Sequence, residues 1–141
     1  MATFTKFNQF VEDLAEKVHN LGSDTLKVGL TNSAPSATNT VWANITEITA
    51  GNGYTAGGTA TTISSSAQTS GTYKLVITDV TFTASGGSIG PFRYVVLYND
   101  TPTSPADPLI GYYDYGTNVT ITDGNSFTTD FSAANGVIQI S

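Results

Sequence analysis

The first part of the chain repeats apolar residues at the spacing of an amphipathic helix. Apolar side chains recur at steps of three and four residues, and charged or amide side chains fill most positions between them. Gly22 then follows, and glycine is common just beyond the last turn of a helix. We therefore predict a helical attachment over residues 1–22, whose apolar face packs against a sheet or a neighbouring subunit. This apolar face consists of Phe7, Phe10, Val11, Leu14 and Val18.

Beyond Gly22 the apolar residues recur with a period of two, which is typical of β-strands. Leu26–Thr31 alternates apolar with small or polar side chains and predicts the first strand. Tyr73–Thr83 predicts a long strand with a bulge near Thr78, where the apolar phase slips. Phe92–Tyr98 is apolar on both faces, so we predict a central strand that is covered on both sides.

Weaker strand patterns and loops separate these segments. Val41–Thr49 is a weaker strand candidate. Ala50–Ser70 is so rich in Gly, Thr and Ser that it predicts a long loop or an irregular edge strand anchored by Tyr54 and Ile63. Asn99–Pro108 holds three of the five prolines and predicts another loop. Further short strands are predicted at Leu109–Tyr115, Asn118–Thr122, Ser126–Ser132 and Val137–Ile140.

These elements predict a mainly β protein. Seven to nine strands follow one helix, and no repeat of fixed period interrupts them. An antiparallel β-sandwich or jelly-roll-like body with one N-terminal amphipathic α-helix fits this order best. We expect a single domain over residues 1–141, with a helical attachment at 1–22 and a β body at 23–141.

The composition is unusually poor in charged residues. Charged residues make up 11% of the chain, against about 25% in average globular domains, while Thr contributes 24 residues and Ser 13. The exposed side of the strands is therefore largely hydroxyl and amide. Burying a hydroxyl costs less free energy than burying a charge, so such a surface is suited to being covered by another protein.

Charge and cysteine content exclude several classes. The formal net charge is −6, and the five Lys and Arg residues are scattered, so a nucleic-acid partner is not expected. The absence of cysteine excludes disulfides and cysteine-based zinc or redox sites. No apolar run is long enough to span a membrane, and the first residues show neither the basic nor the apolar region of a signal peptide. We expect synthesis in a cytoplasm and no membrane partner.

Catalytic, metal and cofactor sites are not expected either. His19 is the one histidine, and its place near the end of the predicted helix is explained by favourable interaction with the helix C-terminus. The aspartates fall near turns, where they commonly bond their own backbone, and Asp123-Gly124-Asn125 gives only a fragment of a calcium loop. We therefore predict that the protein is not an enzyme.

The aromatic residues leave several interpretations open. The group of Tyr112, Tyr113 and Tyr115, with Trp42 and Tyr54, suits a sugar-stacking platform, a protein interface or the core of the sheet. Tyr112 and Tyr113 are neighbours and must point to opposite faces of a strand, so only part of this group shares one surface. Trp42, the lone tryptophan, suits an interface and a core equally well.

Residues from Phe4 to about Gly58 resemble a group of small virion proteins of tailed bacteriophages, encoded close to the major capsid gene. The resemblance lies in the helix pattern FxxFxxxLAxxVHxLGSDTLKV, in the loop TNSAPSATNT, and in the passage from ITEI to GYTAGG. It covers less than half of the chain. Such proteins are similar to capsid decoration or cement proteins, which bind the outside of the head, often as trimers, and carry no enzymatic residues.

The resemblance implies a capsid decoration protein on the outer surface of the virion head. Its expected partners are the major capsid protein and further copies of itself in a homotrimer. A tail or tail-fibre component and a carbohydrate-binding β-sandwich are the alternatives. The residues expected at interfaces are Phe7, Phe10, Val11, Leu14, Val18, Trp42 and Tyr54.

Overall fold

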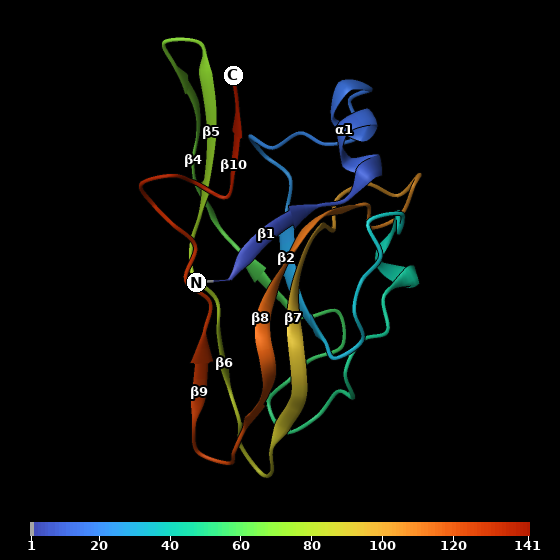
Figure 1. The fold of residues 1–141 in the computed structure, drawn as a ribbon, viewed down its shortest axis with the longest axis vertical. Coiled ribbons are helices and arrows are strands. Elements are labelled where there is room, and N and C mark those ends of the chain that lie inside the picture. Colours follow the sequence, from blue (N-terminus) through green and yellow to red (C-terminus); the bar gives the residue numbers. More distant parts are fainter. Residues whose placement is uncertain (1) are drawn as a thin grey trace.

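The structure, a computed structural model, describes residues 2–141 and is organised around a five-stranded antiparallel sheet (Figure 1). The strand order is β1-β8-β7-β2-β3, so β7 lies at the centre. The strands are β1 (Thr3–Lys6), β8 (Leu109–Ile121), β7 (Ile89–Asn99), β2 (Leu26–Thr31) and β3 (Thr59–Thr61).

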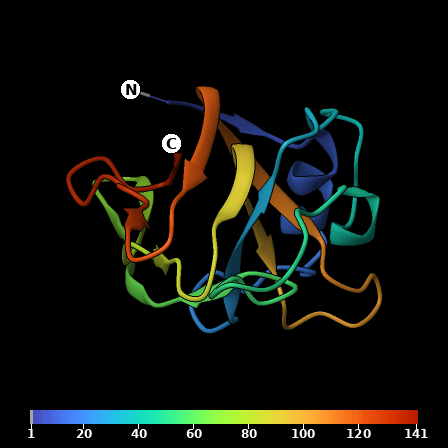
Figure 2. The ribbon, with the colours of Figure 1, turned by 90° about the horizontal axis from the view of Figure 1, so that it is seen from below.

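Two smaller antiparallel sheets form a second layer on one side of this sheet. One has the order β10-β5-β4, and the other pairs β6 with β9. Figure 2 shows these strands on one flank of the large sheet, and α1 with a short 3-10 helix on the other. The strands are β4 (Ile63–Thr69), β5 (Thr72–Ile77), β6 (Thr81–Thr83), β9 (Ser126–Thr128) and β10 (Ile138–Ile140).

The main core lies between the two layers. Leu26, Val28 and Leu30 alternate along β2 and have exposed fractions of 0%, and they belong to one apolar cluster with Leu75 of β5 and Phe82 of β6. Complete burial of such a side chain stabilises the fold by about 1.5–3 kcal/mol relative to exposure. The prediction of a mainly β, sandwich-like body with antiparallel sheets and one short helix near the N-terminus is confirmed.

A second, smaller cluster covers part of the outer face of the five-stranded sheet. Phe7, Val96, Tyr98 and Leu109 are buried there. Trp42 is half-buried and stacks on the ring of Tyr98, with centroids 4.6 Å apart and planes 13° apart. The sheet is therefore covered on both sides at this end.

Cross-strand hydroxyl pairs connect strands of the second layer. Thr81 and Thr128 bring their side-chain oxygens to 2.9 Å, and Thr83 and Ser126 do the same two residues further along the same face. Ion pairs are few. Within residues 2–141 they are Lys27 with Asp100 at 3.2 Å, and Arg93 with Asp114 at 2.8 Å.

The N-terminal segment differs from the prediction. The helix α1 spans only Asn8–Ala15, and Thr3–Lys6 forms β1, which pairs with β8 and so belongs to the main sheet rather than to a separate attachment. The helix ends early because Glu16 leaves helical geometry and Lys17 has a φ of 69°. Val11 is 53% exposed, so the predicted apolar face is only partly buried.

The chain between Val41 and Thr83 also differs from the prediction. The expected strand at 41–49 is a 3-10 helix, η1 (Trp42–Asn44), between isolated bridges. Residues 50–70, expected as a long loop or an irregular edge strand, follow the second alternative and contain the edge strands β3 and β4. The expected long strand at 73–83 is broken near Thr78, as the phase slip indicated, but it becomes two strands, β5 and β6, in different sheets.

Later segments follow the prediction more closely. Phe92–Tyr98 lies within β7, between β8 and β2, and is central as expected. The loop between Asn99 and Pro108 lies between β7 and β8. The two strands expected around Gly116 are one strand, β8, whose pairing with β7 shifts in register there. None of the described residues, 2–141, belongs to a helix long and apolar enough to cross a membrane.

We expect Gly29→Ala to lower the free energy of unfolding by about 1–3 kcal/mol. A Cβ at Gly29 would lie 2.2 Å from Cη2 of Trp42, so the indole would lose its place against the sheet. Urea unfolding of the two proteins measures the difference.

Gly22→Ala is the matched control, because a Cβ there meets nothing closer than 3.4 Å. Its urea midpoint should stay close to that of the parent protein. Equal midpoints for the two alanine variants would show that the contact between Gly29 and Trp42 does not limit stability.

Candidate functional site

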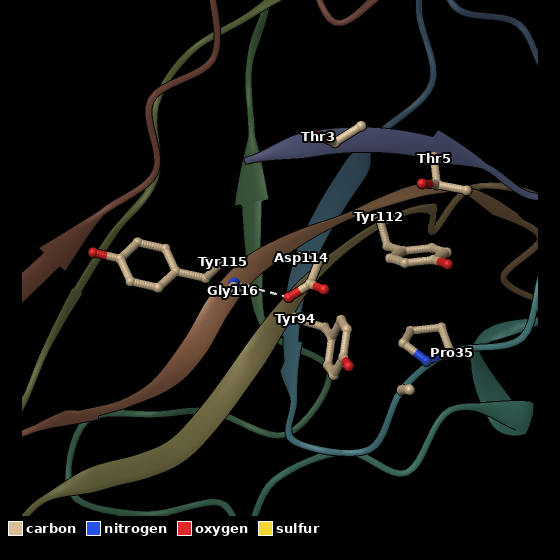
Figure 3. A pocket seen from close by; sticks show the side chains of 9 residues that line it. Thr3, Thr5, Pro35, Tyr94, Tyr112, Asp114, Tyr115 and Gly116 are labelled. Atoms are coloured by element: carbon tan, nitrogen blue, oxygen red, sulfur yellow. Dashed lines mark hydrogen bonds between the residues drawn. The ribbon is translucent and has the colours of Figure 1, made fainter. Parts of the chain in front are cut away.

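The outer face of the five-stranded sheet is left open beyond the cluster around Trp42, and a trough of about 440 Å³ lies there (Figure 3). Strand β1 forms one wall, the loop at residues 34–35 forms another, and β7 with β8 forms the floor. The lining residues are Thr3, Thr5, Ala34, Pro35, Tyr94, Tyr112, Asp114, Tyr115 and Gly116.

Strand register brings the polar and aromatic side chains of the trough together. Asp114 on β8 lies opposite Tyr94 on β7 and opposite Thr3 on β1, and Tyr112 lies opposite Thr5. Residues two apart on a strand share a face, so Tyr112 and Asp114 project to the same side. In Figure 3 the rings of Tyr94 and Tyr112 and the carboxylate of Asp114 surround a common space.

The carboxylate of Asp114 is fixed by three hydrogen bonds. Arg93 donates from Nε to Oδ1 at 2.8 Å and from Nη2 to Oδ2 at 3.1 Å. The backbone N–H of Gly116 donates to Oδ1 at 2.8 Å, from a residue whose φ of 94° suits glycine. The hydrogen bond from Arg93 is the main cause that lowers the pKa of Asp114, so this carboxylate is ionised at neutral pH.

Both tyrosine rings of the trough are supported from behind or from the side. Tyr112 packs on the buried ring of Phe7, with centroids 5.3 Å apart. Tyr94 lies edge-on to Tyr112 at 6.2 Å and 70°, and the guanidinium carbon of Arg93 lies 5.5 Å from the Tyr94 ring centre. The two rings are therefore held in place by contacts within the protein itself.

Tyr115 lines the trough through its place on the chain, but its ring points the other way (Figure 3). The ring packs edge-on against Phe127, at 5.7 Å and 71°, and the residue is 49% exposed. Tyr112 and Tyr115, which the sequence offered together as a stacking platform, therefore lie on opposite sides of β8.

Three of the predicted interface residues are core residues of the single chain. Phe7, Phe10 and Tyr54 have exposed fractions of 0%, 4% and 2%, so they offer no side-chain surface to a neighbour. The hydroxyl of Tyr54 donates to Glu47 at 2.7 Å and accepts from the backbone N–H of Leu30 at 3.0 Å. Burial is the main cause that raises the pKa of Tyr54 far above its usual value.

The other predicted interface residues keep exposed surface. Val11 is exposed, and Leu14, Val18 and Trp42 are half-buried, with Trp42 stacked on Tyr98 rather than free. A groove of about 580 Å³ begins beside Leu14. Its apolar lining comes from Leu14, Leu21, Tyr73 and Ile140, and Lys17, His19, Asn20, Gly22 and Ser66 complete it.

His19 is not on the helix, contrary to the prediction, but in the irregular segment between the helix and β2. It is 5% exposed, its ring packs against Phe10 at 5.1 Å, and its Nδ1 lies 3.1 Å from Nδ2 of Asn99. Asn99 also donates to Asp24 at 2.7 Å. Burial is the main cause that lowers the pKa of His19, and the charges of Asp13 and Asp24 partly oppose it.

The described residues, 2–141, contain no cluster of three or more His, Asp and Glu side chains placed to hold a metal ion. The trough itself offers two supported rings, a paired carboxylate and threonine hydroxyls, which bind by stacking and hydrogen bonding. Sequence reasoning missed Tyr94, Arg93 and Asp114. The available signal was an Arg and an Asp on aromatic strands in a chain that is otherwise poor in charge.

Comparison with known proteins gives no relative. No protein family, no curated protein and no solved structure matches the chain.

We expect the stability of the protein to fall as pH decreases from 7.5 to 5.5, in part because of His19. Its pKa is lowered in the fold, so below the unfolded value of 6.5 the unfolded chain takes up a proton that the folded chain does not. This difference removes stability, by less than about 1.4 kcal/mol for each pH unit. Urea unfolding at several pH values measures it.

The variant His19→Gln isolates this contribution. Its free energy of unfolding should depend less on pH over the same interval. If variant and parent lose stability in parallel, the histidine is not the titrating group.

Proposed function

We propose that this chain is a non-enzymatic structural protein of a tailed-phage virion, a decoration or cement protein on the outer surface of the head, made in the host cytoplasm. Support comes from the resemblance of Phe4–Gly58 to small virion proteins and from a chain with only 11% charged residues. The structural observation that carries the proposal is a long sheet edge with no protection against pairing.

That edge belongs to β4, at the border of the sheet β10-β5-β4. A two-residue turn, Ser70-Gly71, joins β4 to β5, with positive φ at both residues, as in a type I′ hairpin. In such a hairpin the flanking residues, Thr69 and Thr72, exchange backbone hydrogen bonds, and the pattern alternates along the strand. The backbone N–H and C=O groups of Ser66 and Gln68 therefore point to the free side.

Natural sheet edges usually carry charges, prolines or bulges that prevent pairing with other chains. The sequence of β4, ISSSAQT, has neither a charge nor a proline, and its register shift lies at one end, between Ile63 and Ser65. An open edge of this kind is stable in solution when a strand of another chain covers it.

The other border of the same sheet is β10, with the uncharged sequence IQI and Ile140 at 44% exposure. Pairing the β4 edge of one copy with the β10 edge of the next gives a head-to-tail contact. Such contacts form a closed ring when the rotation between copies closes, and closure after three copies gives the homotrimer.

Contact with the major capsid protein uses the apolar surface at the helical end. Val11 stands out from α1 at 53% exposure, and the groove beside Leu14 continues to Ile140 on β10. Each contact is small, but many symmetry-related copies on one shell add avidity. The second candidate is a component of the phage tail. Imaging of the particle distinguishes a location on the head from a location on the tail.

We expect the double substitution Ser65→Glu and Ala67→Glu to abolish self-association while leaving the fold intact. Both side chains are exposed and share a face of β4, so two like charges would oppose a second strand there. Within the hairpin Ala67 lies opposite Lys74 of β5, so a carboxylate at this position meets an opposite charge. Light scattering coupled to size-exclusion chromatography measures the mass of the particle.

The control is Ser65→Thr with Ala67→Thr, which keeps the edge neutral and should keep the oligomer. A parent protein that is monomeric at high concentration would contradict self-association through β4.

We expect Val11→Glu to weaken binding to phage heads stripped of decoration protein by about tenfold or more, and Val11→Ala to weaken it less. Burying an unpaired carboxylate against the shell costs more free energy than losing two methyl groups. Co-sedimentation with stripped heads measures the binding. Recovery of the protein from purified tails but never from heads would refute the head location.

A further inference from the structure

We propose that the trough over β7 and β8 binds a neutral hexopyranose unit of a glycan. This inference goes beyond the coating of a head, which needs no ligand at this place. It rests on Tyr94, Tyr112, Arg93 and Asp114, and none of these residues belongs to the β4 edge or to the groove beside Leu14.

The size and opening of the trough suit one sugar unit with its neighbours extending into solvent. Its volume is about 440 Å³, within the range of about 300–1,000 Å³ of small-molecule sites. In Figure 3 the ring of Tyr112 lies between Thr5 and Pro35. Tyr94 and Tyr112 are only half-buried, so a sugar unit reaches their exposed surface without a change in the sheet.

The two rings provide surfaces for the C–H face of a pyranose. The face of an aromatic ring carries partial negative charge, and the C–H groups on one side of a hexose carry partial positive charge. Tyr94 and Tyr112 are each half-buried and stand at 70° to one another, so they contact a ligand from two directions. Stacking on rings that are already fixed costs little conformational entropy.

The pair of Arg93 and Asp114 matches two adjacent hydroxyl groups. Oδ1 of Asp114 already accepts two hydrogen bonds, whereas Oδ2 accepts one from the protein and retains capacity for another. Arg93 has five N–H donors and uses two of them on Asp114. One sugar hydroxyl donates to Oδ2 and the next accepts from the guanidinium, which orients the ring.

Charge argues against anionic ligands. The net charge of the chain is −6, and Arg93, whose positive charge is paired with Asp114, stands beside the trough and is not one of its lining residues. A phosphate or a sulfated glycan would meet no free cation there. A proline-rich peptide shares the preference for aromatic surfaces but has no hydroxyl pair for Asp114 and Arg93.

The experiment is an NMR titration of the full chain, labelled with ¹⁵N, with glucose, galactose, mannose and N-acetylglucosamine in turn. At least one sugar should give saturable shifts centred on the amides of Thr5, Tyr112 and Gly116. Tyr94→Ala should raise the dissociation constant about tenfold or more, which corresponds to the loss of one stacking surface. Tyr94→Phe keeps the ring and should bind within about twofold of the parent.

Tyr115→Ala is the matched control, because it removes an equally large exposed ring that points away from the trough. It should leave the dissociation constant within about twofold. Three results would overturn the inference. The first is no saturable shift with any sugar, and the second is an equal loss of sugar affinity in Tyr94→Ala and Tyr115→Ala. The third is saturable shifts at these amides with a proline-rich peptide but with none of the sugars. Tyr94→Ala should still bind stripped heads, so failure here is distinguishable from failure of the head-coating function.

Discussion

The burial of β7 on both faces is the constraint on which the rest of the structure depends. Val95 and Leu97 point into the main core, and Val96 and Tyr98 belong to the second cluster. A strand that is apolar on both sides needs two covering layers. The small sheets supply one layer, and Phe7 and Trp42 supply the other only as far as Val96. The remaining outer face is the trough, so the open site results from incomplete coverage of the central strand.

The fold class and the central strand could be predicted from the sequence because they follow from apolar periodicity. The boundaries near the N-terminus could not. Thr3–Lys6 is too short and too polar to be predicted as a strand. Its partner, β8, lies more than a hundred residues away along the chain. The division of residues 73–83 into β5 and β6 could not be predicted for a related reason. A phase slip marks a break, but only tertiary contacts decide whether the two halves stay in one sheet.

The candidate site was harder to predict than the fold. Tyr112 was recognised as an aromatic on a strand, but pairing it with Tyr94, Arg93 and Asp114 requires the register of β7 against β8. That register shifts by one residue between Leu97 and Tyr98, so counting from the loop between β7 and β8 gives the wrong partners. The amino-acid composition indicated a surface suited to contact with other molecules. Composition does not depend on residue order, so it could not show where on the fold that contact lies.

The hydroxyl pairs on the second layer, Thr81 with Thr128 and Thr83 with Ser126, carry a consequence for the environment in which the protein works. These bonds join neutral groups, so dissolved ions screen them very little, whereas exposed ion pairs weaken as ionic strength rises. The pairing of these strands therefore keeps its strength when the surrounding solution changes from dilute fresh water to brine.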